Sequence, residues 1–360
     1  SLYVHIPFCE KICAYCDFTK VFSCSFPHQD YLSGLFSEIE DFNIPFDSLD
    51  TIYIGGGTPS SLKEEELESL LSFLHKRFPH VKEFTLEANP ESLSLVKIKI
   101  CQKYGVNRIS LGVQSTNTEI LKYLNRNHTN EELLECIKNL RDCQFYNYNL
   151  DFIYGIPSQT KEDLIRDIEF CKKYASTHLS FYSLQIEEGT LLFNQKVKPV
   201  SDEVMRIEYD FIVEQLKSMG FLRYEISNFA REGYQSKHNL TYWHDEEYYA
   251  CGVSASGYFQ NERYTNTRSL THYMNKEFNR SIETIDEKAE EFEFLMLNLR
   301  LASGFSLKKF QQRFHKDFLS TYQSEISKVQ DYINCSSDSF SIKEQYLFTM
   351  DSILLTLLKI

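Results

Sequence analysis

Three cysteines near the start of the chain have the spacing of a metal site. They are Cys9, Cys13 and Cys16, in the pattern C-x3-C-x2-C, and they follow a short apolar run. In a loop after a strand, three thiolates can converge on one centre, and thiolates are soft ligands that suit iron–sulfur clusters and zinc. With three cysteines, a 4Fe-4S cluster has one iron that lacks a protein ligand. That iron can take a chelating amino acid.

Further polar residues and a glycine run follow other short apolar runs in the first half of the chain. The segment Gly55–Pro59 (GGGTP) follows one run, and glycines let a ligand approach the backbone closely. Glu87 ends a second run, Gln114 follows a third, and Asp151 lies within a fourth. If these runs are parallel strands, their carboxyl ends meet at one mouth. We therefore expect these residues to line the same cavity as the cysteines.

Zinc is the alternative to an iron–sulfur cluster when the cysteine spacing is considered alone. Three cysteines and one further ligand satisfy a tetrahedral zinc site. The fourth ligand could come from His5, Asp17 or Cys24. The zinc hypothesis gives no reason for the polar residues at the strand ends, so they favour the cluster.

The elements that must position these residues form a repeating pattern. From Leu2 to about Leu184, short β-branched or apolar runs alternate with longer segments of helical period, which is typical of βα units and a parallel sheet. Six such units form either a doubly wound sheet or a partial barrel, and periodicity does not distinguish the two. The six expected strands are Leu2–Ile6, Thr51–Ile54, Glu83–Glu87, Arg108–Leu111, Tyr148–Ile153 and Leu179–Leu184.

The alternation weakens in the second half of the chain. We expect a helix over Asp202–Met219, the run Tyr224–Phe229, a loop rich in Tyr, His and Asn, and a helical region from about Asp286. The simplest division is a core domain over residues 1–229 and a mostly helical C-terminal domain over residues 230–360.

The composition limits the partners and the compartment. A formal net charge of -13 provides no basic field for phosphates, so we expect no nucleic-acid partner. No apolar stretch approaches the length of a transmembrane helix, which leaves at most peripheral membrane contact. The chain is too large for a disulfide-stapled domain, and we expect it in the reducing cytoplasm. The seven other cysteines are expected to be reduced, buried small hydrophobes.

The cysteine motif resembles that of the radical S-adenosylmethionine (SAM) superfamily, in which an aromatic residue, here Tyr15, commonly precedes the last cysteine. Within that superfamily the chain resembles the oxygen-independent coproporphyrinogen III oxidase group. This resemblance implies an α/β fold, a partial (β/α)6 barrel with the cluster at its mouth and a mostly helical C-terminal domain. The matching segments are Tyr3–Cys9, Gly55–Pro59, Arg108–Ser115, Asp151–Pro157 and Tyr224–Phe229.

The resemblance also implies the residues that bind S-adenosylmethionine. Tyr3 and Tyr15 would flank the cofactor, and the backbone of Gly56, Gly57 and Thr58 would meet its amino group. The guanidinium of an arginine suits a carboxylate. The side chains that would contact the polar groups of the cofactor are Glu87, Gln114, Arg126 and Asp151.

Two features distinguish the chain from the oxidases. The oxidases carry a further cysteine where this chain has Phe18, and they have an N-terminal extension that does not precede Cys9 here. The segment His238–Trp243 reads H-N-x-x-Y-W, which resembles the motif of HemW-type heme chaperones. These proteins bind heme and pass it to respiratory acceptors. The oxidase reaction, a radical decarboxylation in porphyrin synthesis, is the alternative.

The resemblance to heme chaperones implies a third cofactor, one heme per chain. Imidazole is a common heme ligand and aromatic side chains pack against the macrocycle, so we expect His238 to be the ligand. Three residues are fallback ligands: Tyr242, His244 and Cys251. The expected partners are heme, heme-acceptor proteins such as respiratory cytochromes, and an electron donor such as a flavodoxin or ferredoxin.

Overall fold

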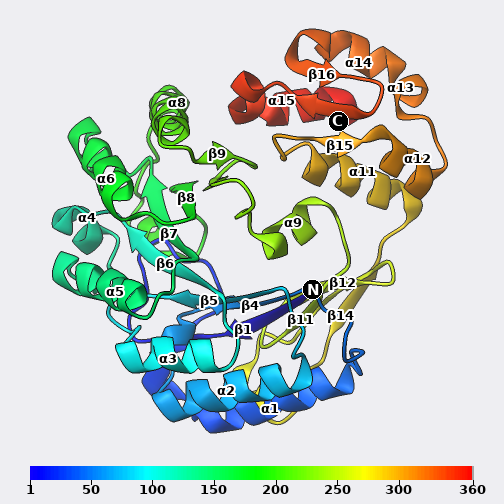
Figure 1. The fold of residues 1–360 in the computed structure, drawn as a ribbon. Helices are drawn as coiled ribbons and strands as arrows, with labels where there is room; N and C mark the ends of the chain where they lie inside the picture. Colours follow the sequence, from blue (N-terminus) through cyan, green and yellow to red (C-terminus); the bar gives the residue numbers. More distant parts are fainter. Residues whose placement is uncertain (359–360) are drawn as a thin grey trace.

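The fold is built around one curved nine-stranded sheet, shown in a computed structural model that describes residues 1–358 (Figure 1). The strand order is β11-β1-β4-β5-β6-β7-β8-β10-β9. The strands of this sheet are β1 (Leu2–Ile6), β4 (Thr51–Gly56), β5 (Glu83–Ala88), β6 (Arg108–Gln114), β7 (Tyr148–Tyr154), β8 (His178–Ser183), β9 (Leu222–Arg223), β10 (Asn228–Ala230) and β11 (Tyr249–Cys251).

The six expected strands are confirmed as β1, β4, β5, β6, β7 and β8, which pair in parallel in chain order. β11 adds a seventh parallel strand beside β1, while β10 and β9 continue the sheet antiparallel beyond β8. β11 and β9 stay at the two ends of the strand order, so the sheet curves without closing. The partial barrel is therefore the correct choice over a doubly wound sheet.

Helices cover the outer face of the curved sheet, as Figure 1 shows, and the main apolar core lies between the two layers. α5 and α6 begin at capping boxes, in which Thr129 pairs with Glu132 and Thr160 with Asp163. The helices between residues 28 and 218 are α1 (His28–Asp41), α2 (Glu64–Arg77), α3 (Leu95–Lys103), α4 (Thr118–Tyr123), α5 (Asn130–Asp142), α6 (Lys161–Tyr174), α7 (Leu191–Asn194) and α8 (Asp202–Ser218).

The segment expected to be a loop rich in Tyr, His and Asn is partly helical, and this expectation was wrong. Ser236 accepts a hydrogen bond from the Asn239 N–H and starts a short helix, α9 (Lys237–Trp243). After β11 comes a three-stranded antiparallel sheet. Its strands, with the helix that lies between the last two, are β12 (Ser256–Phe259), β13 (Glu262–Thr265), α10 (Leu270–Met274) and β14 (Ser281–Thr284).

The C-terminal region is mostly helical, as expected, and has its own core. Phenylalanines such as Phe294, Phe310 and Phe340 pack together in this core. The elements are α11 (Glu287–Asn298), β15 (Phe305–Ser306), α12 (Leu307–Phe314), α13 (Phe318–Thr321), α14 (Gln323–Val329), β16 (Ile333–Cys335), β17 (Ser339–Ile342) and α15 (Met350–Leu358). Because β11 joins the main sheet, the division near residue 230 stays a prediction.

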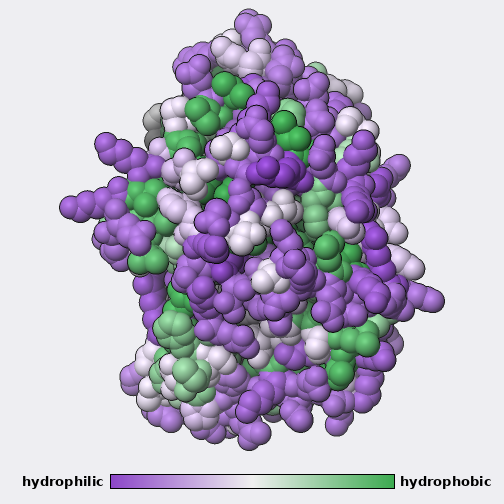
Figure 2. All heavy atoms as spheres, turned by 90° about the vertical axis from the view of Figure 1, so that its left-hand side faces the viewer, coloured by the Kyte–Doolittle hydropathy of each residue, from purple (hydrophilic) through white to green (hydrophobic). Residues whose placement is uncertain are grey.

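The surface and the cysteines complete the description. Figure 2 shows the face over the left-hand helices of Figure 1, which is mainly hydrophilic with hydrophobic residues in small groups. Among the described residues no helix is long and apolar enough to cross a membrane. All ten cysteines are free. The expectation that the seven outside the motif are buried was wrong for Cys24 and Cys335, which are exposed, and for Cys143, which is half-buried.

A buried carboxylate connects the first helix to the second half of the chain. Glu38 of α1 is fully buried and accepts hydrogen bonds from the Gly252 N–H at 2.9 Å and from Asn266 at 2.7 Å. Arg280 pairs with it at 2.8 Å, and the Tyr273 hydroxyl also donates to it. Each donor compensates part of the cost of burying the charge.

We predict that Glu38→Ala lowers the free energy of unfolding by about 3 kcal/mol, because it removes the carboxylate that pairs with the partly exposed Arg280 and accepts from three buried donors. Urea unfolding of the variant and the wild type measures the difference. Glu40→Ala, at an exposed position of the same helix, is the control and should change stability by less than about 0.5 kcal/mol. Equal stability of the two variants would contradict the role given to Glu38.

Candidate cofactor site

A cavity of about 500 Å³ lies at the carboxyl ends of the parallel strands. The three cysteines and the strand-end residues meet there, as the parallel topology predicts. The expected site residues that line it are Cys9, Cys13, Tyr15, Cys16, Gly56, Gly57, Thr58, Glu87, Gln114, Arg126 and Asp151.

Backbone hydrogen bonds fix the cysteine loop from two sides. The Ala14 N–H donates to the Leu124 carbonyl at 2.9 Å, and the Leu192 N–H donates to the Ala14 carbonyl at 3.0 Å. The Ala14 side chain packs in a small apolar cluster with both leucines. The Asn125 amide donates to the Ile12 carbonyl at 2.7 Å. The spacing of the cysteines is therefore held by residues that lie more than a hundred positions away.

Donors and cations lie beside the cysteines. The Thr58 hydroxyl donates to the Cys9 sulfur at 3.7 Å, and Arg126 Nη1 donates to the Cys13 sulfur at 3.4 Å. The Lys20 ammonium donates to the Cys16 carbonyl. Burial raises the pKa of the Cys9 thiol to about 11, and the Thr58 hydrogen bond opposes that rise. Positive charge beside the sulfurs favours the thiolates that bind metals.

The arrangement of the cysteines suits a cluster better than one zinc ion. Within residues 1–358, no three His, Cys, Asp or Glu side chains are grouped tightly enough to hold one metal ion. A zinc site needs all its ligands around one atom, whereas cysteines of a 4Fe-4S cluster bind separate irons. Gly57 lets the backbone before Cys9 pack closely against the end of β4, because a Cβ there would lie 2.7 Å from the Phe8 carbonyl oxygen and 3.0 Å from the Cys9 sulfur. The donor set therefore fits the cluster.

Arg126 is buried with its guanidinium at the wall of the cavity. Besides the contact to Cys13, Nη2 donates to Asn89 Oδ1 at 2.8 Å and to the Gly112 carbonyl at 2.8 Å. The expectation that Arg126 reaches the cavity is consistent with this position. Among the described residues, Arg126 is the only arginine that lines the cavity. Its guanidinium suits a carboxylate of a ligand.

A bulge at the end of β6 turns Gln114 into the cavity wall. The pairing of β6 with β7 shifts between Gly112 and Gln114, and Gln114 has a φ of 66°. A non-glycine residue in this left-handed region is strained unless its surroundings hold it. Arg126 holds the start of the bulge through the Gly112 carbonyl.

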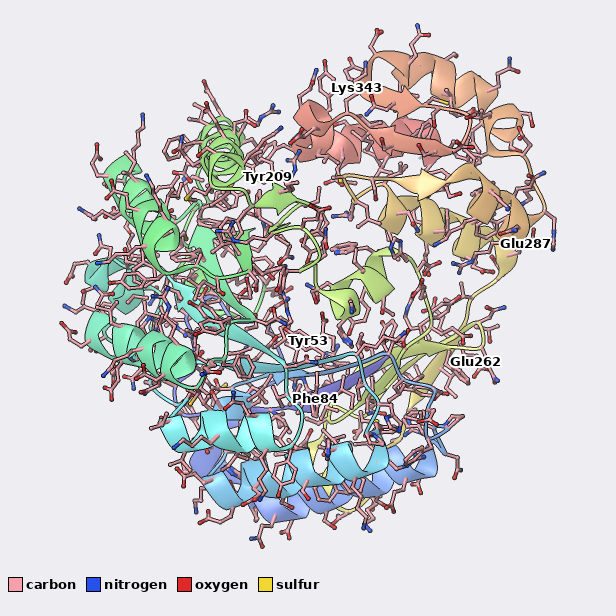
Figure 3. The ribbon with its side chains drawn as sticks, in the orientation of Figure 1. Tyr53, Phe84, Tyr209, Glu262, Glu287 and Lys343 are labelled. Atoms are coloured by element: carbon pink, nitrogen blue, oxygen red, sulfur yellow. The ribbon has the colours of Figure 1, made fainter. Side chains whose placement is uncertain are left out.

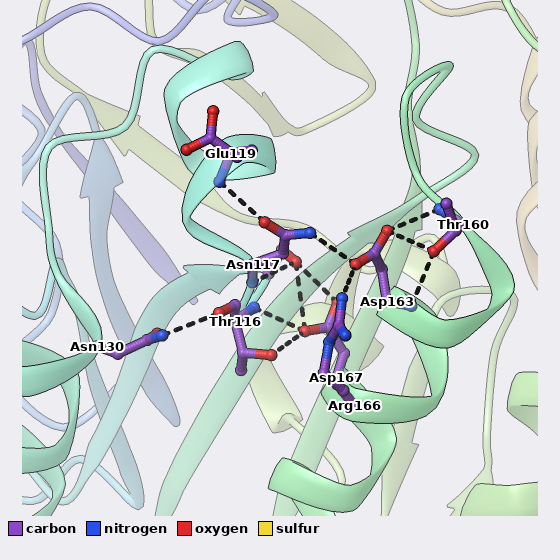
Figure 4. A network of polar contacts seen from close by, with 9 residues as sticks. Thr116, Asn117, Glu119, Asn130, Thr160, Asp163, Arg166 and Asp167 are labelled. Carbon is purple, nitrogen blue, oxygen red and sulfur yellow. Dashed lines mark hydrogen bonds and ion pairs between the residues drawn. The ribbon is translucent and has the colours of Figure 1, made fainter.

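A polar network on α6 holds the residues after the bulge (Figure 4). The buried Asp167 carboxylate accepts hydrogen bonds from the Thr116 N–H and hydroxyl, both at 2.6 Å, and from the Ser115 hydroxyl at 3.0 Å. Asp163 accepts a hydrogen bond from the Asn117 amide at 2.6 Å. Three consecutive residues are thus fixed to one helix, which keeps the preceding Gln114 in place.

Two carboxylates, Glu87 and Asp151, face the same cavity. Tyr53 donates its hydroxyl to Glu87 Oε1 at 2.7 Å, and the Gly56 N–H donates to Oε2 at 3.0 Å. Burial raises the pKa of Glu87 to about 7, the hydrogen bond from Tyr53 opposes the rise, and the charge of Asp151 adds to it. Burial also raises the pKa of Asp151, although Ser110 donates to it at 2.8 Å.

The charges in the cavity complement those of S-adenosylmethionine, which carries a sulfonium, an ammonium and a carboxylate. Two carboxylates match the positive groups and one guanidinium matches the carboxylate. The positive φ of 113° at Gly56 turns its N–H toward Glu87 and leaves the adjoining backbone exposed to a ligand. The residues present therefore fit the cofactor. When bound to a reduced cluster, it would supply radical chemistry.

Two of the expected site residues do not line the cavity. Tyr3 lies one layer behind it, where its ring stacks on Tyr53 with centroids 6.3 Å apart and its hydroxyl meets His5 Nδ1 at 3.0 Å. His238 lies at the opposite end of the barrel, beside the first residues of β4 and β5. Their roles toward cofactors stay predictions.

His238 is fully buried and both of its ring nitrogens are occupied. Nδ1 lies 2.7 Å from the Thr51 hydroxyl and Nε2 lies 2.7 Å from the Tyr242 hydroxyl. Burial lowers the pKa of His238 to about 3, so the ring is neutral. Because Thr51 donates to Ser1 at 2.9 Å, Nδ1 carries the proton and Nε2 accepts from Tyr242. Nε2 is therefore the nitrogen with a lone pair.

Sequence reasoning missed three residues that complete the site: Tyr53, Asn89 and Lys20. Tyr53 precedes the glycine run by two positions, so the alternation of side chains along a strand could have placed it on the inner face with Gly55. Asn89 follows Glu87 by two positions, so the same alternation could have placed the two side chains on one face. Lys20 lies in the cysteine loop and carried no signal beyond its charge.

Comparison with known proteins places the chain in a family. Residues 3–171 match the radical SAM superfamily and residues 285–336 match the HemN C-terminal domain. Proteins named heme chaperone HemW from Lactococcus lactis, Bacillus subtilis and Escherichia coli are 38%, 35% and 33% identical to it. The matches cover 91%, 92% and 84% of this chain and 89%, 91% and 82% of theirs.

A solved structure has the same fold. The structure of coproporphyrinogen III oxidase (HemN) from Escherichia coli matches 99% of this chain and 89% of its own, with a TM-score of 0.84 and 20% sequence identity. This identity shows a shared fold and no more. With the sequence matches, the cysteine cavity and the C-terminal region taken together, the chain belongs to the HemW heme chaperone family of the radical SAM superfamily.

Proposed function

We propose that this protein is a heme chaperone that binds one heme and transfers it to acceptor proteins, with a 4Fe-4S cluster and S-adenosylmethionine in the barrel. The observation that carries the proposal is the similarity, over most of the chain, to proteins named heme chaperone HemW. That similarity spans both the cysteine cavity and α9. The cytoplasm suits a protein whose ten cysteines are all free.

The cofactor half of the proposal is supported by the cavity. Cys9, Cys13 and Cys16 would hold three of the four irons, and Glu87 and Asp151 line the same cavity. Arg126 would take the carboxylate of the cofactor, and the backbone of Gly56 to Thr58 its amino group. An external electron donor such as a flavodoxin or ferredoxin would reduce the cluster.

The heme half of the proposal is supported by α9. The imidazole Nδ1–H of His238 is held by Thr51, the kind of second contact that orients a metal-binding histidine. Nε2 would ligate the iron once the Tyr242 hydroxyl has moved away. Respiratory cytochromes are the class of acceptor that the resemblance implies.

Replacement of the motif cysteines tests the cluster. We predict that Cys9→Ala, Cys13→Ala or Cys16→Ala, reconstituted anaerobically, loses the iron–sulfur absorbance, while the wild type holds about four irons per chain. Cys24→Ala, at an exposed cysteine near the loop, is the control and should keep the wild-type iron content. Zinc in place of iron in the anaerobically purified wild type would contradict the cluster.

Heme titration of two variants tests the ligand. We predict that His238→Ala weakens heme binding at least about tenfold without loss of the iron–sulfur absorbance. Tyr242→Phe should tighten it by about tenfold, because it removes the hydroxyl that competes for Nε2. His272→Ala, at a surface histidine paired with Glu277, is the control. Unchanged heme affinity in His238→Ala would assign the iron to another ligand.

Turnover on the same sample separates a chaperone from an oxidase. Phe18, where the oxidases have a further cysteine, lies at the mouth of the cavity with 61% of its surface exposed. We expect stoichiometric heme binding and no decarboxylation of coproporphyrinogen III. Turnover with weak heme binding would make the protein an oxidase.

The pH dependence of cofactor binding tests Glu87. The raised pKa of about 7 means that the carboxyl is protonated below pH 7 and must lose its proton to meet a cation. The affinity for S-adenosylmethionine should therefore fall as the pH decreases from about 7.5 to about 6, by up to about tenfold per unit. Glu87→Gln should bind weakly and without this dependence. Equilibrium dialysis measures both, and identical pH profiles would contradict the role of Glu87.

A further inference from the structure

Tyr53 lies between the cofactor cavity and α9. It is the third residue of β4, lines the cavity, and points into the concave side of the sheet, where α9 also lies (Figure 3). Its hydroxyl donates to Glu87 Oε1 at 2.7 Å. The ring therefore has one edge at the cavity and one face toward the helix that carries the HemW-like motif.

Two neighbouring rings hold the ring of Tyr53. The imidazole of His238 stacks on it with centroids 5.1 Å apart and planes at 24°, and the ring of Tyr3 stacks on it at 6.3 Å and 27°. Aromatic rings stacked at these separations attract each other more strongly than the burial of their apolar surface alone accounts for. Tyr53 can therefore change its position only if one of the flanking rings moves.

His238 itself is fixed by its surroundings. Thr51 and Tyr242 occupy its two nitrogens, and Glu83, the first residue of β5, accepts the His238 N–H at 2.9 Å and the Lys237 N–H at 3.0 Å. The start of α9 is thus tied to the first residues of two strands. His238 therefore packs against Tyr53 from a fixed position.

The position of Glu87 depends on Tyr53. A Cβ at Gly55 would lie 2.9 Å from the Glu87 carboxyl, so the carboxyl sits directly against β4. Its two oxygens accept from the Tyr53 hydroxyl and from the Gly56 N–H. Among the described contacts, Tyr53 is the one side chain that donates to Glu87.

We propose that Tyr53 is a positioning residue for cofactor binding, and that His238 keeps its ring in the place from which it orients Glu87. The proposal rests on the proposed contact between Glu87 and S-adenosylmethionine. It gives the contact between His238 and Tyr242, one helical turn apart, a role in supporting the cofactor cavity. This role does not require heme.

The Tyr53 hydroxyl affects the pKa of Glu87, and a loss of packing that kept this hydrogen bond would not remove that effect. The groups that face the carboxyl are the Tyr53 hydroxyl and Gly56 N–H of β4, the Asp151 carboxyl of β7, and more distantly the phenols of Tyr3 and Tyr242. The Tyr53 hydrogen bond lowers the pKa of Glu87. Its removal should therefore shift the pH midpoint of cofactor binding upward.

Tyr53→Phe is the first test, because it keeps the stacked ring and removes only the hydroxyl. In the heme-free, cluster-reconstituted protein, we expect the affinity for S-adenosylmethionine to fall about tenfold. The pH midpoint should rise and the iron–sulfur absorbance should stay unchanged. Tyr248→Phe is the matched control, since Tyr248 packs on Tyr242 and has no described contact with Glu87. It should bind the cofactor like the wild type.

The His238→Ala variant, also measured without heme, tests whether the stacked imidazole holds Tyr53 in place. The affinity for S-adenosylmethionine should fall several-fold in this variant. The double variant with Tyr53→Phe should lose less affinity than the two single losses combined, because both substitutions act through the contact between Tyr53 and Glu87. Wild-type affinity and pH midpoint in Tyr53→Phe would overturn the proposal. Wild-type affinity in Glu87→Gln as well would show that the contact between Glu87 and the cofactor is itself absent. The heme titration is a separate measurement, so its failure is distinguishable from both.

Discussion

The parallel pairing of six strands is the constraint on which the rest of the structure depends. Because β1, β4, β5, β6, β7 and β8 run in one direction, their carboxyl ends meet at one mouth and their first residues meet at the other. The same pairing forces each crossover helix to the outside of the curve. The inner face is then free for polar side chains, and it holds carboxylates, a guanidinium and several phenols.

Polar groups inside the barrel must be satisfied, and this requirement connects its two ends. Glu83 at the start of β5 accepts backbone N–H groups at the start of α9, so the helix is drawn into the concave face. Tyr53, between α9 and the cavity, transmits the position of that helix to Glu87. A heme ligand at His238 and a cofactor at the mouth would therefore occupy sites separated by a single ring.

The cavity wall is held by contacts between residues that are distant in the chain. The loop of the cysteines is fixed by Leu124 and Leu192, and the bulge at Gln114 is fixed by Arg126 on one side and by Asp167 on the other. These contacts are made by the protein's own groups, and they fix the side chains and backbone of the cavity wall. Such preorganisation lowers the cost of binding.

The sequence by itself determined the six strands, the cysteine motif and most of the residues that line the cavity. These follow from local periodicity, from residue type and from the rule that parallel strands end at one mouth. The tertiary structure decided that the segment around His238 is a helix buried in the barrel, that Tyr3 lies behind the cavity, and that Tyr53, Asn89 and Asp167 support the site. The bond between Thr51 and His238 joins residues 187 positions apart. No local pattern encodes such a contact, because it exists only after the chain has closed on itself.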